Sequence, residues 1–194
     1  MHTHDERLSE ITQQLKALQQ ERKRLLRESA YMTVNNYTFM GQGNHPLSLQ
    51  DLFGHHRDLI VVHNMGSSCV YCTLWADGFN GMLSALTNRT AFVLASPDTP
   101  DEQQSFAESR GWQFTMVSTH NTTFTHDMGF TSEHNGTVYN MPGYSSFYRQ
   151  DDGSIERVSK DYFGPGDEYC GLWGMFNALK EGPNHWTPDY SYPS

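Results

Sequence analysis

The chain has 194 residues and a mass of 22.2 kDa, which is enough for one domain with an extension. Hydrophobic residues make up 37% of the chain and aromatic residues 13%, a composition that excludes global disorder. Its 13 basic and 22 acidic residues give a net charge of −9 at pH 7. Nucleic acids and anionic membrane surfaces are therefore poor candidate partners, because they would repel so acidic a protein.

The longest apolar runs, at 59–62 and 91–95, are far shorter than the roughly 18 residues of a membrane span. The first residues are charged and have no apolar segment behind them, so we expect no secretory signal. Three cysteines are too few, and odd in number, for a disulfide scaffold. We therefore expect a cytoplasmic protein in which the two cysteines at C-x-x-C spacing serve redox or metal chemistry.

Residues 1–30 are predicted to form an N-terminal helical extension, with one long helix over 5–28. Five apolar residues and one arginine follow one another at spacings that alternate between three and four: Leu8, Ile11, Leu15, Leu18, Arg22 and Leu25. This heptad pattern covers only three repeats. It fits an amphipathic helix packed on its own domain or on a neighbouring subunit, and so allows a homodimer formed through this helix.

Residues 31–182 are predicted to form the main domain. The expected strands are 37–40, 58–63, 91–95, 114–118 and the two arms of a hairpin, 145–149 and 154–159. The expected helices are 49–53, 70–86, 100–110 and 167–180. Residues 120–142 are polar and are expected to be irregular with short helical pieces, and 183–194 should form an extended, docked tail. Buried strands alternating with helices predict an α/β protein with parallel strand pairs, to which the hairpin adds antiparallel edge strands.

Cys69 and Cys72 directly follow a predicted buried strand and open the next helix, the arrangement typical of thioredoxin redox motifs. Free backbone N–H groups and the positive end of the helix dipole lie at such a position and stabilise a thiolate. We therefore expect Cys69 to be the exposed attacking nucleophile, and Cys72 to be covered and to resolve a mixed disulfide. The partner would be a disulfide or thiol of a protein or small molecule, and no cofactor is needed.

The same spacing leaves two other functions open. Cys69 and Cys72 could bind copper or zinc together with a histidine such as His63. Thr73 occupies the place where haem attachment requires a histidine, and the second C-x-x-C of a zinc ribbon is missing. The remaining hypothesis is a non-catalytic interaction protein whose cysteines are inert.

Supporting roles can be assigned to several neighbours of the pair, each beside a purely structural interpretation. His63 ends the preceding strand and could stabilise a thiolate, move a proton or bind metal, or it could bond to backbone. Trp75 could shape a substrate cleft, although core packing is its more frequent role. Asp77 could accept a proton from Cys72, but a carboxylate at the surface or one that ties the helix is favoured. Cys170 is expected to be a small buried hydrophobe.

Residues 69–81, CVYCTLWADGFNG, resemble the signature of a bacterial thioredoxin-like family of predicted dithiol–disulfide oxidoreductases, the domain of unknown function 899. Similar segments cover nearly the whole chain and include 47–53, 59–63, 110–114, 127–130 and 142–143. The resemblance implies a thioredoxin-like fold, with a central mixed sheet flanked by helices and a redox-active Cys69/Cys72 pair. It supplies no substrate.

Three features differ from related patterns. Many members of the resembled family have a longer loop before the cysteines, whereas only Asn64–Ser68 intervene here, so the mouth of the site should differ. Thioredoxins place a cis-proline before the strand that faces the disulfide, and Pro142 is the nearest candidate. Residues 47–53 also resemble the start of peroxiredoxin-like chains, but the C-x-x-C pair argues against a peroxiredoxin's single peroxidatic cysteine.

Overall fold

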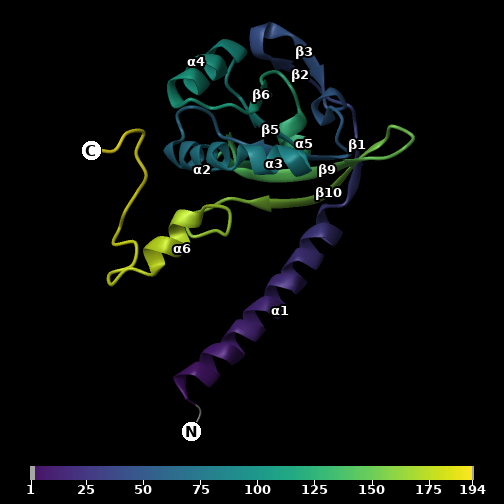
Figure 1. The fold of residues 1–194 in the computed structure, drawn as a ribbon. Coiled ribbons are helices and arrows are strands. Elements are labelled where there is room, and N and C mark those ends of the chain that lie inside the picture. The colour runs from purple at the N-terminus through teal and green to yellow at the C-terminus, as the bar shows by residue number, and fades with distance from the viewer. Residues whose placement is uncertain (1–2, 194) are drawn as a thin grey trace.

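Residues 3–193 are described by a computed structural model whose centre is one mixed sheet (Figure 1). Its eight strands have the order β1-β10-β9-β4-β5-β6-β2-β3. They are β1 Met32–Val34, β2 Thr38–Gly41, β3 Pro46–Ser48, β4 Asp58–His63, β5 Ala91–Ser96, β6 Thr115–Ser118, β9 Gly143–Arg149 and β10 Ile155–Tyr162. β5 pairs in parallel with both β4 and β6, whereas the other pairs are antiparallel. The predicted mixed α/β sheet is confirmed, except that the hairpin β9–β10 is not an edge, because β1 pairs outside it.

Helices cover the sheet and extend from it. Within residues 3–193 they are α1 His4–Ala30, α2 Val70–Gly81, α3 Leu83–Arg89, α4 Pro100–Arg110, α5 Phe124–Asp127 and α6 Gly171–Asn177, with 3₁₀ turns η1 Gln42–Asn44 and η2 Asp51–Phe53. α4 begins with a capping box between Thr99 and Glu102 and ends at Gly111, which has the left-handed conformation that glycine adopts without strain. The predicted limits of this helix are therefore confirmed.

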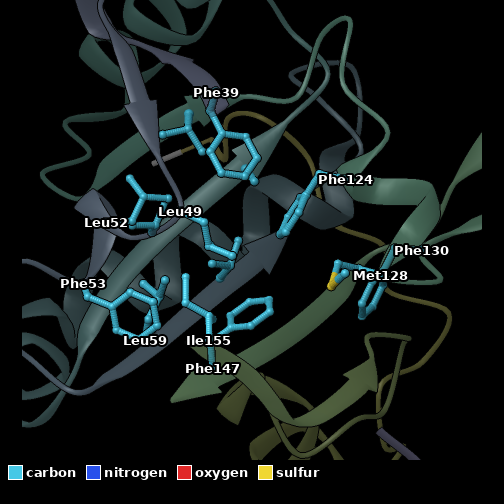
Figure 2. Packing of buried hydrophobic residues seen from close by; sticks show 14 residues of the cluster. Phe39, Leu49, Leu52, Phe53, Leu59, Phe124, Met128, Phe130, Phe147 and Ile155 are labelled. Atoms are coloured by element: carbon cyan, nitrogen blue, oxygen red, sulfur yellow. The ribbon is translucent and has the colours of Figure 1, made fainter. Parts of the chain in front are cut away.

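The two faces of the sheet carry two separate hydrophobic cores, because successive strand residues point to opposite faces. Along β4, Leu59 and Val61 enter the core shown in Figure 2, where they pack with Phe39, Phe53, Leu49, Leu52, Phe124, Met128, Phe130, Phe147 and Ile155. Val62 enters the other core, which contains Trp75, Ala76 and Phe79 of α2. Continuous apolar runs in β4 and β5 are thus explained by burial on both faces.

Some predicted elements have different limits in the structure. The single helix expected over 70–86 is wrong, because the chain leaves helical geometry at Met82 (φ −108°, ψ 6°) and divides into α2 and α3. The helix expected over 167–180 is shorter, since the carboxylate of Asp167 accepts the N–H groups of Tyr169 and Cys170 and holds them in a turn before α6. The helix expected over 49–53 is only the 3₁₀ turn η2.

The segment 120–142 is more regular than expected. It contains α5 and a separate two-stranded sheet of β7 Thr131–His134 and β8 Thr137–Asn140. Asn135 and Gly136 connect these strands and both have positive φ, at 51° and 76°. Asn-Gly is the preferred pair for such two-residue hairpin turns. The expected short helical piece is confirmed by α5, but the expectation that the rest of the segment is irregular is wrong. The dipeptide that marks the hairpin was visible in the sequence.

α1 leaves the sheet and extends away from the rest of the molecule (Figure 1). Its attachment is near its C-terminal end, where Arg22 pairs with Asp161 and Glu168. The buried Arg157 of β10 donates to the carbonyl of Ala30 at 2.8 Å, which fixes the last residue of the helix. No helix within residues 3–193 combines the length and the apolar character that a membrane span requires.

Candidate functional site

Cys69 and Cys72 lie where β4 leads into α2. Cys69 is the N-cap of α2, and its Sγ accepts a hydrogen bond from the backbone N–H of Cys72 at 3.2 Å. Cys69 is half-buried, whereas the side chain of Cys72 is buried within the first turn. The structure therefore places one accessible and one covered sulfur at the positive end of a helix, in the relative exposure that the sequence predicts.

The loop that presents Cys69 is held by side chains of neighbouring strand ends. The amide oxygen of Asn64 accepts from the N–H of Gly66 at 2.7 Å, and the Asp98 carboxylate accepts from the N–H of Ser67 at 2.8 Å. Gly66 has φ +108°, and a Cβ there would lie 2.8 Å from Oδ1 of Asp98. The short loop thus requires glycine at this position and fixes the approach of the chain to Cys69.

The two thiols have opposite pKa shifts. The pKa of Cys69 is lowered to about 7, mainly by a hydrogen bond from the Cys72 side chain and further by the backbone N–H groups of Cys72 and Tyr71. The pKa of Cys72 is raised by its hydrogen bond to Cys69, by burial and by the negative charge of the Cys69 thiolate. The pair therefore loses its first proton near neutral pH, and Cys69 carries the resulting charge.

Alkylation kinetics should reveal this shift. Because the thiolate is the reacting form, the rate with iodoacetamide at Cys69 should reach half its maximum near pH 7. The Cys72→Ala substitution removes the leading cause of the shift, so the midpoint should move to higher pH. Peptide mapping after alkylation identifies which cysteine has reacted. Cys170→Ser serves as the control, and its midpoint pH should equal that of the wild type. A midpoint that is the same with and without the Cys72 thiol would contradict this account.

The C-terminal segment brings an unpredicted residue to the site. Tyr190 donates its hydroxyl to the carbonyl of Ser67 at 3.0 Å, and Arg110 donates to the carbonyl of Tyr190. The pKa of Tyr190 is raised by burial and by the nearby charges of Cys69 and Cys72. The phenol therefore reaches the loop that presents Cys69, although 123 residues separate it from Ser67 in sequence. The sequence predicts a docked tail, but no local pattern shows where the tail docks.

His63 does not lie with the cysteine pair. It shares the side of β4 that carries Leu59 and Val61, and its ring stacks on Phe130 and Phe124 at centroid distances of 3.8 and 5.3 Å. Its Nε2 is 2.9 Å from Oγ of Ser145, and its Nδ1 is buried with no hydrogen-bond partner among residues 3–193. The pKa of His63 is lowered to about 3 by burial and by the charges of Arg157 and Lys160. The ring is consequently neutral at physiological pH.

This buried imidazole predicts acid sensitivity. The unfolded chain binds a proton at His63 near pH 6.5, whereas the folded chain does so only near pH 3, so stability falls as the pH drops between these values. From pH 7 to pH 5 the loss from this group should be about 2 kcal/mol. Urea unfolding of wild type and His63→Phe at both pH values measures it, with exposed His55→Phe as the control. Equal pH dependence in wild type and His63→Phe would refute it.

Trp75 and Asp77, the other expected supporting residues on α2, make contacts that hold the fold together. Trp75 is buried in the core and donates its Nε1–H to Asp167 at 3.4 Å. Asp77 pairs with Arg110 and accepts from the indole N–H of Trp112 at 2.8 Å, so it ties α2 to the end of α4. These contacts fit the structural interpretations of Trp75 and Asp77 given above.

Pro142 and Cys170 also have clear positions. Pro142 immediately precedes β9, and its carbonyl accepts from the N–H of Phe163 at 2.9 Å. None of the peptide bonds in residues 3–193 is cis, so Pro142 does not supply the cis-proline sought from the resemblance. Cys170 is a buried free thiol at the N-cap of α6, and burial raises its pKa. It packs with the core that contains Trp75.

The copper or zinc set of Cys69, Cys72 and His63 is not brought together. His63 packs between phenylalanines of the core on the opposite side of the sheet from α2. In the described part of the chain, no group of three or more His, Cys, Asp or Glu side chains is placed to hold a metal ion. The chemistry that the arrangement offers directly is that of a dithiol with one activated sulfur.

Comparisons with known proteins agree with this fold. The family model described as bacterial protein of unknown function (DUF899) matches residues 2–191. A search of curated proteins finds no match.

Among solved structures, peroxidoxin BcpB from Mycobacterium tuberculosis is 18% identical with a TM-score of 0.56, covering 69% of this chain and 84% of its own. A Xylella fastidiosa PrxQ mutant is 17% identical with a TM-score of 0.56, covering 68% and 83%. A Xanthomonas campestris peroxiredoxin Q mutant is 15% identical with a TM-score of 0.58, covering 73% and 90%. These likenesses confirm the expected thioredoxin-like fold.

Proposed function

The chain belongs to the bacterial family of unknown function DUF899, and we propose that it is a thiol–disulfide oxidoreductase. The observation that carries the proposal is the Cys69 sulfur at the N-cap of α2, which has a pKa of about 7 and accepts the Cys72 N–H. In this proposal Cys69 attacks and the covered Cys72 resolves. The partner is a disulfide or thiol of a protein or small molecule.

In the first step the Cys69 thiolate attacks one sulfur of a substrate disulfide. A bond forms between that sulfur and Cys69, the substrate S–S bond breaks, and the leaving thiolate takes a proton from water. Cys69 then carries no charge, so a main cause of the raised pKa of Cys72 is removed. Cys72 loses its proton and attacks Cys69, which forms the Cys69–Cys72 disulfide and releases the second substrate thiol. The dithiol gives two electrons, and the substrate is reduced to two thiols.

Reduction of a peroxide is the second candidate, and the likeness to peroxiredoxin structures favours it. The Cys69 thiolate would attack the peroxide oxygen, forming a sulfenic acid and releasing an alcohol or water. Cys72 would then condense with the sulfenic acid, forming the same disulfide and one water molecule. Both candidates use the same two sulfurs and differ in the bond that Cys69 attacks. No contact in the described residues favours the metal-binding alternative over these two.

One assay on the wild-type chain separates the candidates. The protein is reduced, freed of reductant and mixed with either insulin or an alkyl hydroperoxide, and loss of its thiols is followed over time. The proposal expects faster oxidation by the protein disulfide than by the hydroperoxide at equal concentration. Faster oxidation by the hydroperoxide would replace it with the second candidate. If neither substrate oxidises the pair, the non-catalytic alternative is favoured.

A further inference from the structure

α1 presents an exposed apolar face along most of its length, and near its C-terminal end Arg22 of this face pairs with Asp161 and Glu168. We call the positions Leu8, Ile11, Leu15, Leu18, Arg22 and Leu25 the seam. Leu8, Leu15 and Leu18 are 61%, 54% and 66% exposed although they share one side of the helix. A capping box between Thr3 and Glu6 stabilises the N-terminal turn of this helix, so the apolar face stays helical as far as Leu8. A contiguous exposed apolar face of this kind marks an interaction surface.

We propose that the seam binds the seam of a second copy of this chain, with the two α1 helices antiparallel. In antiparallel pairs of helices, the first and fourth heptad positions face one another across the interface. This register places Leu8 opposite Leu25 and Leu15 opposite Leu18. Because the arrangement is two-fold symmetric, each contact occurs twice and both apolar faces are buried together.

The charges on α1 select this orientation over the parallel one. A parallel pair would place Arg22 opposite its own copy, whereas the antiparallel pair places it opposite Ile11, where its charged end can remain with Asp161 and Glu168. Residues 4–17 have two basic and three acidic side chains, or −1, and residues 18–30 have four basic and two acidic, or +2. Antiparallel pairing brings the acidic half of each helix beside the basic half of the other.

A cleft next to the seam offers the main competing explanation for the exposed face. It has a volume of about 800 Å³ and lies between α1, α3 and strands β4 and β9. Arg22 and Leu26 line it from α1, but Leu8, Ile11, Leu15 and Leu18 lie outside it. A small ligand in the cleft would therefore leave most of the seam exposed. A second α1 helix covers the whole seam and runs along the edge of the cleft.

Sedimentation of the full chain between about 1 and 100 μM tests the proposal, with a species of twice 22.2 kDa expected. Replacement of two leucines that the dimer would bury, Leu15→Glu with Leu18→Glu, should raise the dimer dissociation constant at least about 100-fold. The matched control is Gln13→Glu with Gln20→Glu, which adds the same charge on the opposite side of α1 and should leave the dimer intact. Circular dichroism checks that each variant is folded.

Orientation is tested by disulfide cross-linking in a background of Cys69→Ser and Cys72→Ser. Leu8→Cys and Leu25→Cys should form a covalent dimer only when the two variants are mixed. Cross-linking of either variant with itself would indicate parallel helices and overturn the proposal. A wild-type chain that stays monomeric at about 100 μM, or a dimer unaffected by the two glutamates, would overturn it as well.

Discussion

Replacement of Cys69 by serine is expected to abolish turnover of a disulfide substrate, with a loss of at least about 1,000-fold, because the attacking thiolate is removed. Cys72→Ser should behave differently. Its Cys69 still attacks, but nothing resolves the product, so the variant should accumulate a covalent adduct with the substrate. Cys170→Ser is the matched control, since this buried thiol lies in the core and should leave the rate within about two-fold.

Mass spectrometry of each variant after incubation with insulin measures the adduct, and thiol release measures turnover. Turnover that survives Cys69→Ser would rule out the mechanism. An adduct on Cys69→Ser, with none on Cys72→Ser, would reverse the assignment of the two sulfurs. Each of these outcomes is separate from the oligomeric state, because α1 is not part of the cysteine site.

Substitution of Gly143 by alanine is expected to lower the free energy of unfolding by about 3 kcal/mol or more. Gly143 begins β9 and pairs with both His63 and Tyr162. An added Cβ would lie 2.2 Å from the carbonyl oxygen of Asp161 and 2.4 Å from a ring carbon of Phe130. Neither neighbour can move freely, because the first is backbone in β10 and the second stacks on His63.

Urea unfolding at neutral pH measures the effect, and Gly78→Ala provides the control. Gly78 lies inside α2 and an added Cβ there meets nothing within 4 Å. This control should be neutral or should stabilise the fold by up to about 1 kcal/mol, since alanine is the better helix former. Equal free energies of unfolding for the Gly143→Ala variant and the wild type would contradict the prediction, because β9 and β10 could then accommodate the added Cβ at no energetic cost.

The position of the cysteine pair was predictable because a buried strand, a short loop and a helix follow one another in sequence. The orientation of His63 was predictable too, because alternate residues of a strand point to the same face. Residues 59, 61 and 63 of β4 therefore lie on one face and Val62 lies on the other. Asn135-Gly136 is the preferred pair for a two-residue hairpin turn, so the β7–β8 hairpin was also predictable, although the polar composition of the segment suggested an irregular structure. The arrival of Tyr190 at Ser67 could not be predicted, because it depends on a contact across 123 residues that leaves no local pattern.

Under the proposed function, the hydrogen bonds at the start of α2 would also link the reduction potential of the pair to the fold. They stabilise the Cys69 thiolate, which exists only in the reduced protein. At pH values above about 7 the folded chain therefore holds the reduced form more tightly than an unfolded chain would, and its disulfide is correspondingly easier to reduce. We therefore expect folding of α2 to make the pair a stronger oxidant, and reduction of the pair to make the folded protein more stable.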